Sequence, residues 1–194
     1  MNNEIRTWSQ EYPLEHWPED YINVKDKIIL DLGCGLFGLI DAPYYQLNTC
    51  TTNYWMTHAA KKVIGLDMSE TDIAWLRDNV IFTEEDENGN LVPRCTFFVD
   101  KIDSPEKIKN YITQYNVDIV KSDIEGFESI LLDMSDEDFS IIEEYYIETH
   151  TKKLYEKALE KLIRCNYKIR SIMHFAGTPL KGQSIKLIFA YKNK

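Results

Sequence analysis

An apolar segment that ends in a glycine-rich turn stands out near the start of the sequence. Residues 28–32 read IILDL, and Gly33, Gly35 and Gly38 follow. A run of aliphatic and β-branched residues is typical of a strand that is buried on both faces of a parallel sheet. Glycines at its end let the backbone turn sharply into a helix and approach a ligand closely. This pattern predicts the first strand and turn of an α/β domain.

Strand and helix patterns alternate after this turn. Ser69 and Ser104 are each placed to cap a helix, and Asn88-Gly89 predicts a small hairpin across residues 83–94. We expect strands at residues 27–33, 62–67, 95–100, 117–123, 144–150, 167–174 and 184–191. The last two lie on either side of a turn-forming stretch and should pair antiparallel. The sequence therefore predicts an α/β, doubly wound, mostly parallel seven-stranded sheet of the Rossmann-like type with a C-terminal antiparallel hairpin.

The chain has the length of one domain with a short N-terminal addition. We expect the domain to span residues 25–194, preceded by a segment of residues 1–24 rich in aromatic and acidic residues. The aromatic residues of that segment include Trp8, Tyr12, Trp17 and Tyr21. The segment could form a helical cap over the carboxyl edge of the sheet, where ligands bind in such folds, or pack against the outside of the sheet. Residues 44–58 are expected to form a polar, aromatic-rich insertion after the first helix begins.

The charge balance argues against nucleic acid and anionic membranes as partners. The chain has 22 basic and 32 acidic residues, a formal net charge of -10, whereas proteins that bind phosphates usually carry a basic patch. No apolar stretch approaches the roughly 20 residues of a membrane span, and the first residues lack the pattern of a signal peptide. The cysteines lie far apart, which gives no support to a zinc site or a redox motif. We expect a cytoplasmic protein whose partner is a small molecule.

Acidic residues stand at the ends of the first three predicted strands. Asp31 lies two residues before the first glycine, where it would repel a pyrophosphate but suit the amino group of a methionine moiety. Asp67 can accept hydrogen bonds from two ribose hydroxyls, and Asp100 can accept one from an adenine amino group. A ligand with a charged amino group, a ribose and an adenine, and without a pyrophosphate, fits these three acids, and S-adenosylmethionine is such a ligand. The predicted cofactor-binding residues are Asp31, Gly33, Cys34, Gly35, Gly38, Asp67, Met68 and Asp100. Among them, Cys34 is expected to act through packing and not as a nucleophile.

The fourth and fifth predicted strands carry motifs that point to a family. Residues 117–128 read VDIVKSDIEGFE, similar to the K-x-D-x-E-G-x-E signature of FkbM-type methyltransferases, and residues 147–150 read IETH. Over about residues 27–191 the chain resembles a class I S-adenosylmethionine-dependent methyltransferase of the FkbM type. The resemblance implies methyl transfer, most often to an oxygen of a small-molecule or sugar-like acceptor. The end of the second predicted strand differs from the family pattern. Asp67-Met68-Ser69 stands there, where a motif that contains Glu-Pro is common in the family.

Four residues of these motifs are candidates for catalysis. An alcohol acceptor must lose its proton, and Asp123 at the end of the fourth strand is the first candidate for the base. Lys121, two residues earlier on the same strand face, could keep this carboxylate ionised or orient the acceptor. Glu125 could bind the acceptor or close the loop, and His150 is a second candidate base because its pKa is ordinarily near neutrality. Alternatively, Lys121 and Asp123 form an internal ion pair, and His150 is a hydrogen-bonded structural residue.

Other functions stay open at this point. Asp100, Asp123, Glu125 and His150 could gather around a magnesium ion, but spacing does not establish this, and no metal is part of the predicted site. A catalytically silent module that binds S-adenosylmethionine or S-adenosylhomocysteine and acts through a partner is the main alternative to an enzyme. A nicotinamide-dependent oxidoreductase is disfavoured by Asp31 and by the terminal hairpin.

Overall fold

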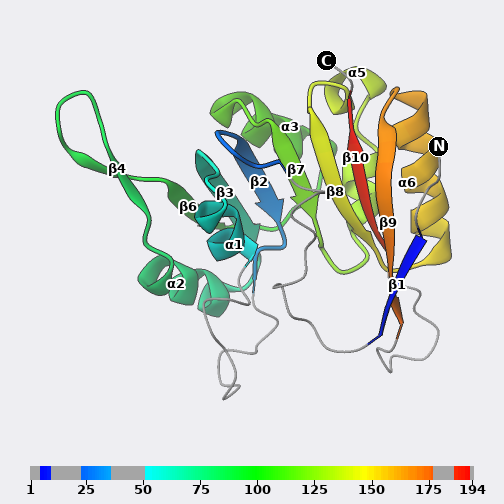
Figure 1. Ribbon diagram of the computed structural model, residues 1–194, viewed down its shortest axis with the longest axis horizontal. Helices are drawn as coiled ribbons and strands as arrows, with labels where there is room; N and C mark the ends of the chain where they lie inside the picture. Colours follow the sequence, from blue (N-terminus) through cyan, green and yellow to red (C-terminus); the bar gives the residue numbers. More distant parts are fainter. Residues whose placement is uncertain (1–4, 10–22, 36–50, 177–185, 193–194) are drawn as a thin grey trace. The chain divides into compact units, whose positions relative to one another are not determined.

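The computed structural model describes residues 5–9, 23–35, 51–176 and 186–192 (Figure 1). The chain divides into two compact units, one of Pro13–Ile102 and one of Met1–Tyr12 together with Asp103–Lys194. We call them the glycine-turn unit and the His150 unit. Strand β1 (Ile5–Ser9) belongs to the His150 unit because it pairs with a strand of that unit.

Three parallel strands, in the order β2, β3, β6, form the sheet of the glycine-turn unit. Their bounds are Ile28–Leu32, Lys62–Asp67 and Cys95–Val99. The unit also contains the helices α1 (Thr51–Thr57) and α2 (Glu70–Asn79). A separate hairpin of β4 (Thr83–Glu85) and β5 (Leu91–Pro93) extends away from these strands (Figure 1).

Local sequence signals account for helix α2 and for the hairpin of β4 and β5. At the start of α2, the backbone N–H of Asp72 donates to Ser69 Oγ at 3.3 Å, and Ile73 and Leu76 are fully buried on one side of that helix. Gly89 has a φ of 79°, a left-handed conformation that glycine adopts at no steric cost. The predicted helix start and hairpin are confirmed.

Strand β10 (Lys186–Tyr191) lies between two strands of the His150 unit and runs antiparallel to both. These neighbours are β8 (Glu144–Thr149) and β9 (Lys168–Ala176). Strand β7 (Ile119–Ser122) pairs in parallel with β8, and β1 pairs in parallel with β9. The predicted antiparallel ending of the sheet is confirmed.

The helices described in the His150 unit are α3 (Pro105–Tyr115), α4 (Glu128–Leu132), α5 (Asp136–Phe139) and α6 (Lys152–Arg164). Ser104 and Thr151 cap α3 and α6, since their side-chain oxygens accept from backbone N–H groups three residues later. Both caps lie where serine or threonine precedes a run of helical periodicity in the sequence.

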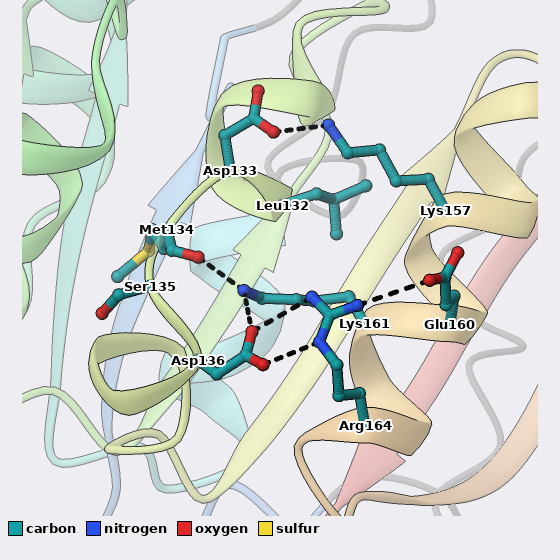
Figure 2. Close-up of a pocket in the computed structure, with 9 residues that line it drawn as sticks. All are labelled: Leu132, Asp133, Met134, Ser135, Asp136, Lys157, Glu160, Lys161 and Arg164. Carbon is teal, nitrogen blue, oxygen red and sulfur yellow. Dashed lines mark hydrogen bonds and ion pairs between the residues drawn. The ribbon is translucent and has the colours of Figure 1, made fainter.

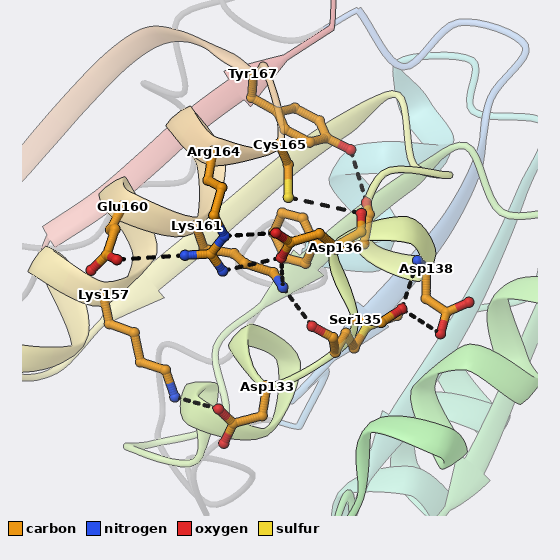
Figure 3. A network of polar contacts seen from close by, with 12 residues as sticks. Asp133, Ser135, Asp136, Asp138, Lys157, Glu160, Lys161, Arg164, Cys165 and Tyr167 are labelled. Atoms are coloured by element: carbon orange, nitrogen blue, oxygen red, sulfur yellow. Dashed lines mark hydrogen bonds and ion pairs between the residues drawn. The ribbon is translucent and has the colours of Figure 1, made fainter.

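A polar network fastens α6 to the end of α4 and the start of α5 (Figures 2 and 3). The buried Lys161 Nζ lies 2.6 Å from Asp136 Oδ1, and Arg164 Nε lies 2.7 Å from Asp136 Oδ2. Lys157 Nζ lies 2.6 Å from Asp133 Oδ1. These residues line a cavity of about 340 Å³ (Figure 2). Because each cation already has an acidic partner, we interpret the network as a structural clamp that holds α4 in place.

An aromatic core lies between β8 and α5. The rings of Tyr145 and Phe139 stack with centroids 4.1 Å apart. The Tyr145 hydroxyl donates to the backbone oxygen of Phe139 at 2.9 Å. The Tyr167 hydroxyl lies 2.6 Å from the backbone oxygen of Ile142 and 2.9 Å from that of Phe139, so both buried hydroxyls have acceptors.

The observed fold is a Rossmann-like, mostly parallel sheet with antiparallel C-terminal strands, and all seven predicted strands are present. Strand β1 is an additional strand. It includes Trp8, whereas Tyr12, Trp17 and Tyr21 lie outside the described residues. Of the two arrangements left open for the N-terminal segment, a helical cap does not describe Ile5–Ser9, whose backbone pairs with β9 as a strand.

Part of the expected insertion is a helix. Residues 51–57 form α1, whereas residues 44–50 lie outside the described part of the chain. Across the residues that the structure describes, no helix combines the length and the hydrophobicity that a membrane-spanning segment requires.

Candidate functional site

Asp31 is held by α1 at the end of β2. Its side chain is fully buried, and Oδ2 accepts hydrogen bonds from Thr51 Oγ1 at 2.7 Å and Trp55 Nε1 at 3.4 Å. Both donors belong to the sequence that was expected to be an insertion. This part of the chain therefore orients the acid at the first strand.

The glycine turn begins with a left-handed residue. Gly33 has a φ of 74°, and its N–H and that of Cys34 both donate to the backbone oxygen of Leu66 on β3. Cys34 is buried, and a Cβ at Gly65 would lie 2.8 Å from its Sγ. This close packing agrees with the expectation that Cys34 is a packing residue. Gly38 lies outside the described residues.

The carboxylate of Asp67 is fixed at the end of β3 by two backbone donors. Gly35 N–H donates to Oδ2 at 2.9 Å, and Ser69 N–H donates to Oδ1 at 2.8 Å. A Cβ at Gly35 would lie 2.4 Å from Asp67 Oδ2 and 2.9 Å from Asp72 Oδ2. Only glycine allows the turn to approach this carboxylate so closely.

Two exposed apolar side chains accompany this acid. Met68 is 71% exposed, and Val99, the strand partner of Asp67, is 42% exposed. The N–H of Asp100 donates to the backbone oxygen of Asp67 at 2.8 Å. The ends of β3 and β6 thus bring together two acids and two apolar side chains, a combination suited to a ribose and a flat base.

A second group of polar side chains surrounds His150 in the His150 unit. Nδ1 of His150 lies 3.0 Å from Glu128 Oε1. Its Nε2 lies 3.4 Å from Glu125 Oε2, and 3.6 Å from both Asp123 Oδ1 and Glu148 Oε1. Because an ionised carboxylate only accepts hydrogen bonds, Nδ1 carries the hydrogen toward Glu128. We call these five residues the His150 cluster.

Glu128 also shapes the loop after β7. Its Oε1 accepts from the N–H groups of Ile124 and Gly126, both at 3.2 Å. Glu125 and Gly126 have left-handed φ values of 53° and 95°, respectively. The side chains of Glu125 and Phe127 in this turn are more than half exposed. A fully buried carboxylate thus holds two exposed side chains in place.

Burial and charge shift the pKa values within the cluster. Burial raises the pKa of Asp123, against the opposing charges of Lys121 and His150, and burial together with Asp123 raises the pKa of Glu148 to about 8. Burial lowers the pKa of His150, but its hydrogen bond to Glu128 and the surrounding acids outweigh burial and raise it to about 9. His150 is therefore protonated at neutral pH. An ionised Asp123 can accept a proton there, whereas protonated His150 cannot.

The structure brings together three of the four candidate catalytic residues, Asp123, Glu125 and His150. Lys121 is buried, and its charge acts on Asp123 and Glu148. Asp100 belongs to the other unit.

Glu128 and Glu148 belong to the quoted motifs but were given no role from sequence. One signal was available for Glu148, which stands two residues before His150 and therefore shares its strand face.

Solved structures share this fold at low sequence identity. A protein of Listeria monocytogenes assigned as an S-adenosylmethionine-dependent methyltransferase matches with a TM-score of 0.54 and 15% identity, covering 94% of this chain and 99% of that chain. An S-adenosylmethionine-dependent methyltransferase from Mesorhizobium loti matches with a TM-score of 0.51 and 16% identity, covering 92% and 100%. A Lactococcus lactis protein assigned as a hemolysin matches with a TM-score of 0.60 and 16% identity, covering 93% and 86%. No protein-family model and no curated protein sequence matches the chain. The chain is thus structurally similar to class I S-adenosylmethionine-dependent methyltransferases.

Proposed function

We propose that the protein is an S-adenosylmethionine-dependent methyltransferase of the FkbM type that methylates an oxygen of a small-molecule or sugar-like acceptor. The observation that carries the proposal is the carboxylate of Asp67, which Gly35 and Ser69 fix at the end of β3. An acid in this position, next to a glycine turn, suits the two hydroxyls of a ribose.

The glycine-turn unit offers one group for each part of the cofactor. Asp67 would accept hydrogen bonds from the ribose, Met68 and Val99 would contact the adenine, and Asp100 would accept from its amino group. Asp31 would attract the charged amino group of the methionine moiety. The exposed apolar side chains fit this assignment, because an adenine ring removes apolar surface from water when it binds.

The His150 cluster offers the groups that an alcohol acceptor needs. The bound cofactor supplies a methyl group on a sulfonium, which an oxygen nucleophile attacks in line. Asp123 would take the proton of the acceptor hydroxyl as the new carbon–oxygen bond forms. Lys121 favours the ionised form of this base, and Glu125 would accept a hydrogen bond from a further hydroxyl.

The exposed Phe127 favours a sugar-like acceptor. Phe127 follows Glu125 and Gly126 in a turn held by Glu128. An exposed aromatic ring can bind the apolar face of a sugar, and carboxylates can bind its hydroxyls. The net charge of -10 supports a small molecule over nucleic acid as the acceptor.

Calorimetry and thermal unfolding with S-adenosylhomocysteine, S-adenosylmethionine and NAD test the proposal. Ligand at 100 times its dissociation constant should stabilise the protein by about 2.7 kcal/mol, a rise in melting temperature of roughly 5 to 10 °C at this size. We expect this rise with the adenosyl compounds and none with NAD. A rise with NAD alone would contradict the proposal. Binding of the adenosyl compounds without turnover of any hydroxylated acceptor would favour a silent binding module.

A further inference from the structure

The His150 ring has acidic side chains at both of its nitrogens. Nδ1 lies 3.0 Å from Glu128 Oε1, whereas Nε2 lies 3.4 Å from Glu125 Oε2 and 3.6 Å from Asp123 Oδ1. A neutral imidazole carries a hydrogen on one nitrogen only, and the protonated ring carries one on each. Because each nitrogen faces an acidic oxygen, the geometry favours the protonated ring, with Nδ1–H donated to Glu128 and Nε2–H directed toward Asp123 and Glu125.

Glu128 supplies the charge that keeps this proton on the ring. Its carboxylate is fully buried, and Oε1 accepts hydrogen bonds from His150 and from the N–H groups of Ile124 and Gly126. The other oxygen, Oε2, is buried and accepts no hydrogen bond from the described residues. A buried carboxylate is costly unless a cation lies beside it, and the protonated ring is a cation in direct contact with this one. Glu128 and His150 therefore form a buried ion pair.

The other side of the ring faces the proposed base. Asp123 Oδ1 is buried and accepts no hydrogen bond from the described residues, so its ionised form depends on nearby cations. Burial raises the pKa of Asp123, whereas the charges of Lys121 and His150 lower it. The 3.6 Å between Nε2 and Oδ1 is longer than a hydrogen bond, and contacts of this kind often tighten when a substrate binds. In the free protein the ring thus acts on Asp123 through its charge.

Neighbouring charged groups do not take the place of this ion pair. Glu148 Oε1 also lies 3.6 Å from Nε2, but burial together with Asp123 raises the pKa of Glu148 to about 8, so this acid is mostly protonated at pH 7. Lysines on the neighbouring elements α6 and β10 are paired elsewhere, as in Lys157–Asp133, Lys161–Asp136 and the contact of Lys186 with the Tyr155 ring. Lys121 and His150 therefore remain the cations that act on Asp123.

We propose that Glu128 and His150 are positioning residues for methyl transfer: Glu128 keeps the imidazole oriented and protonated, and the charged ring holds Asp123 in the ionised form that takes the proton of the acceptor. This role differs from that of a base, because a protonated imidazole has no lone pair left to accept a proton. The role in turnover rests on the proposed function, whereas the coupling of charges between Glu128, His150 and Asp123 does not.

Nuclear magnetic resonance titration of the His150 ring tests this coupling without cofactor or turnover. The hydrogen bond to Glu128 and the surrounding acids outweigh burial and raise the pKa of the ring to about 9 in the wild type. Glu128→Gln keeps an oxygen that accepts hydrogen bonds but removes the charge, and should weaken proton binding by the ring about 10-fold or more. Asp123→Asn should weaken it as well, because two charged groups favour each other reciprocally. Glu156→Gln, at an exposed acid of α6, should titrate as the wild type does.

His150→Gln tests the role in turnover. This variant lacks the cation beside Asp123, so the pKa of Asp123 should rise, and the acidic limb of the kcat/KM profile should move to higher pH. At higher pH Asp123 ionises without help, and the rate should return to within about 10-fold of the wild-type rate. If His150 were itself the base, the rate would fall by about 10²- to 10⁴-fold at every pH. Glu156→Gln should keep the wild-type profile.

A ring that is neutral at pH 7 in the wild type would overturn the inference, and this measurement needs no variant to fold. Unchanged ring titration in both Glu128→Gln and Asp123→Asn would also overturn it. Circular dichroism shows whether His150→Gln is folded, and an unmoved acidic limb in the folded variant would exclude the positioning role. S-adenosylhomocysteine affinity, measured on the same samples, reports on the glycine-turn unit. Failure of the wild type to bind this compound would overturn the proposed function, whereas the ring titrations decide the charge coupling separately.

Discussion

The backbone N–H of Gly35 donates to Asp67 Oδ2 at 2.9 Å, across 32 residues of sequence. The turn that follows the first strand is thereby tied to the acid that ends the second. The contact requires glycine, because any Cβ at residue 35 would overlap the carboxylate. The glycine turn therefore has a specific task here, which is to orient Asp67.

Gly35→Ala should displace the Asp67 carboxylate and weaken S-adenosylhomocysteine binding about 10- to 100-fold, since a misplacement of about 1 Å has effects of this size. Isothermal titration calorimetry measures the affinity. Gly89→Ala is the control, because a Cβ at this left-handed glycine would lie in open space and meet no functional group. This control should lower stability by about 1 kcal/mol and leave the affinity unchanged. Equal affinities in all three proteins would contradict the role of Gly35.

Asp123→Asn should separate cofactor binding from turnover. Loss of a general base lowers the rate typically by about 10²- to 10⁴-fold, whereas the cofactor contacts assigned to the glycine-turn unit stay intact. Steady-state rates with an acceptor that the wild type methylates, and calorimetry with S-adenosylhomocysteine, measure the two properties. A parallel fall in cofactor affinity would contradict this role and would mean that Asp123 contacts the cofactor.

Glu128→Ala should destabilise the fold by about 3 kcal/mol, because it leaves His150 and two backbone N–H groups without their buried acceptor. Urea unfolding followed by circular dichroism measures the free energy of unfolding. Glu156→Ala removes an exposed carboxylate and should change the stability by less than about 0.5 kcal/mol. Similar stabilities of the two variants would show that Glu128 is not a fixed part of the loop.

Stability should fall as the pH rises above about 10, the ordinary pKa of tyrosine. Burial raises the pKa of Tyr145 well above that value and also raises the pKa of Tyr167. Above pH 10 the unfolded chain loses these protons while the folded chain keeps them, so the unfolded state binds fewer protons and is favoured. Urea unfolding between pH 9 and 11 measures the effect.

Tyr145→Phe is the companion variant. It should cost about 1 kcal/mol at neutral pH through the lost hydrogen bond to Phe139, and its stability should fall less steeply at alkaline pH. A fall as steep as that of the wild type would mean that other groups cause it.

The elements of the fold were predictable because their signals are local. Ser69 and Ser104 each precede a helix that begins at the following residue, and Asn88-Gly89 forms the expected hairpin turn. Strand β1 was missed because its pairing partner β9 lies more than 160 residues away in sequence, with Ile5 opposite Ile172. A short strand at a sheet edge depends on that partner and not on its own pattern.

The sequence by itself determined which kinds of side chain stand at the strand ends. An acid that follows an apolar strand stays at that end in any parallel sheet, and residues two apart share a face, so Lys121 with Asp123 and Glu148 with His150 were readable as pairs. Only the tertiary structure decided which groups touch. Gly35 meets Asp67, and Glu128 meets His150 across 22 residues. These contacts depend on how separate segments pack, and distances of a few tenths of an ångström decide whether a carboxylate accepts a hydrogen bond.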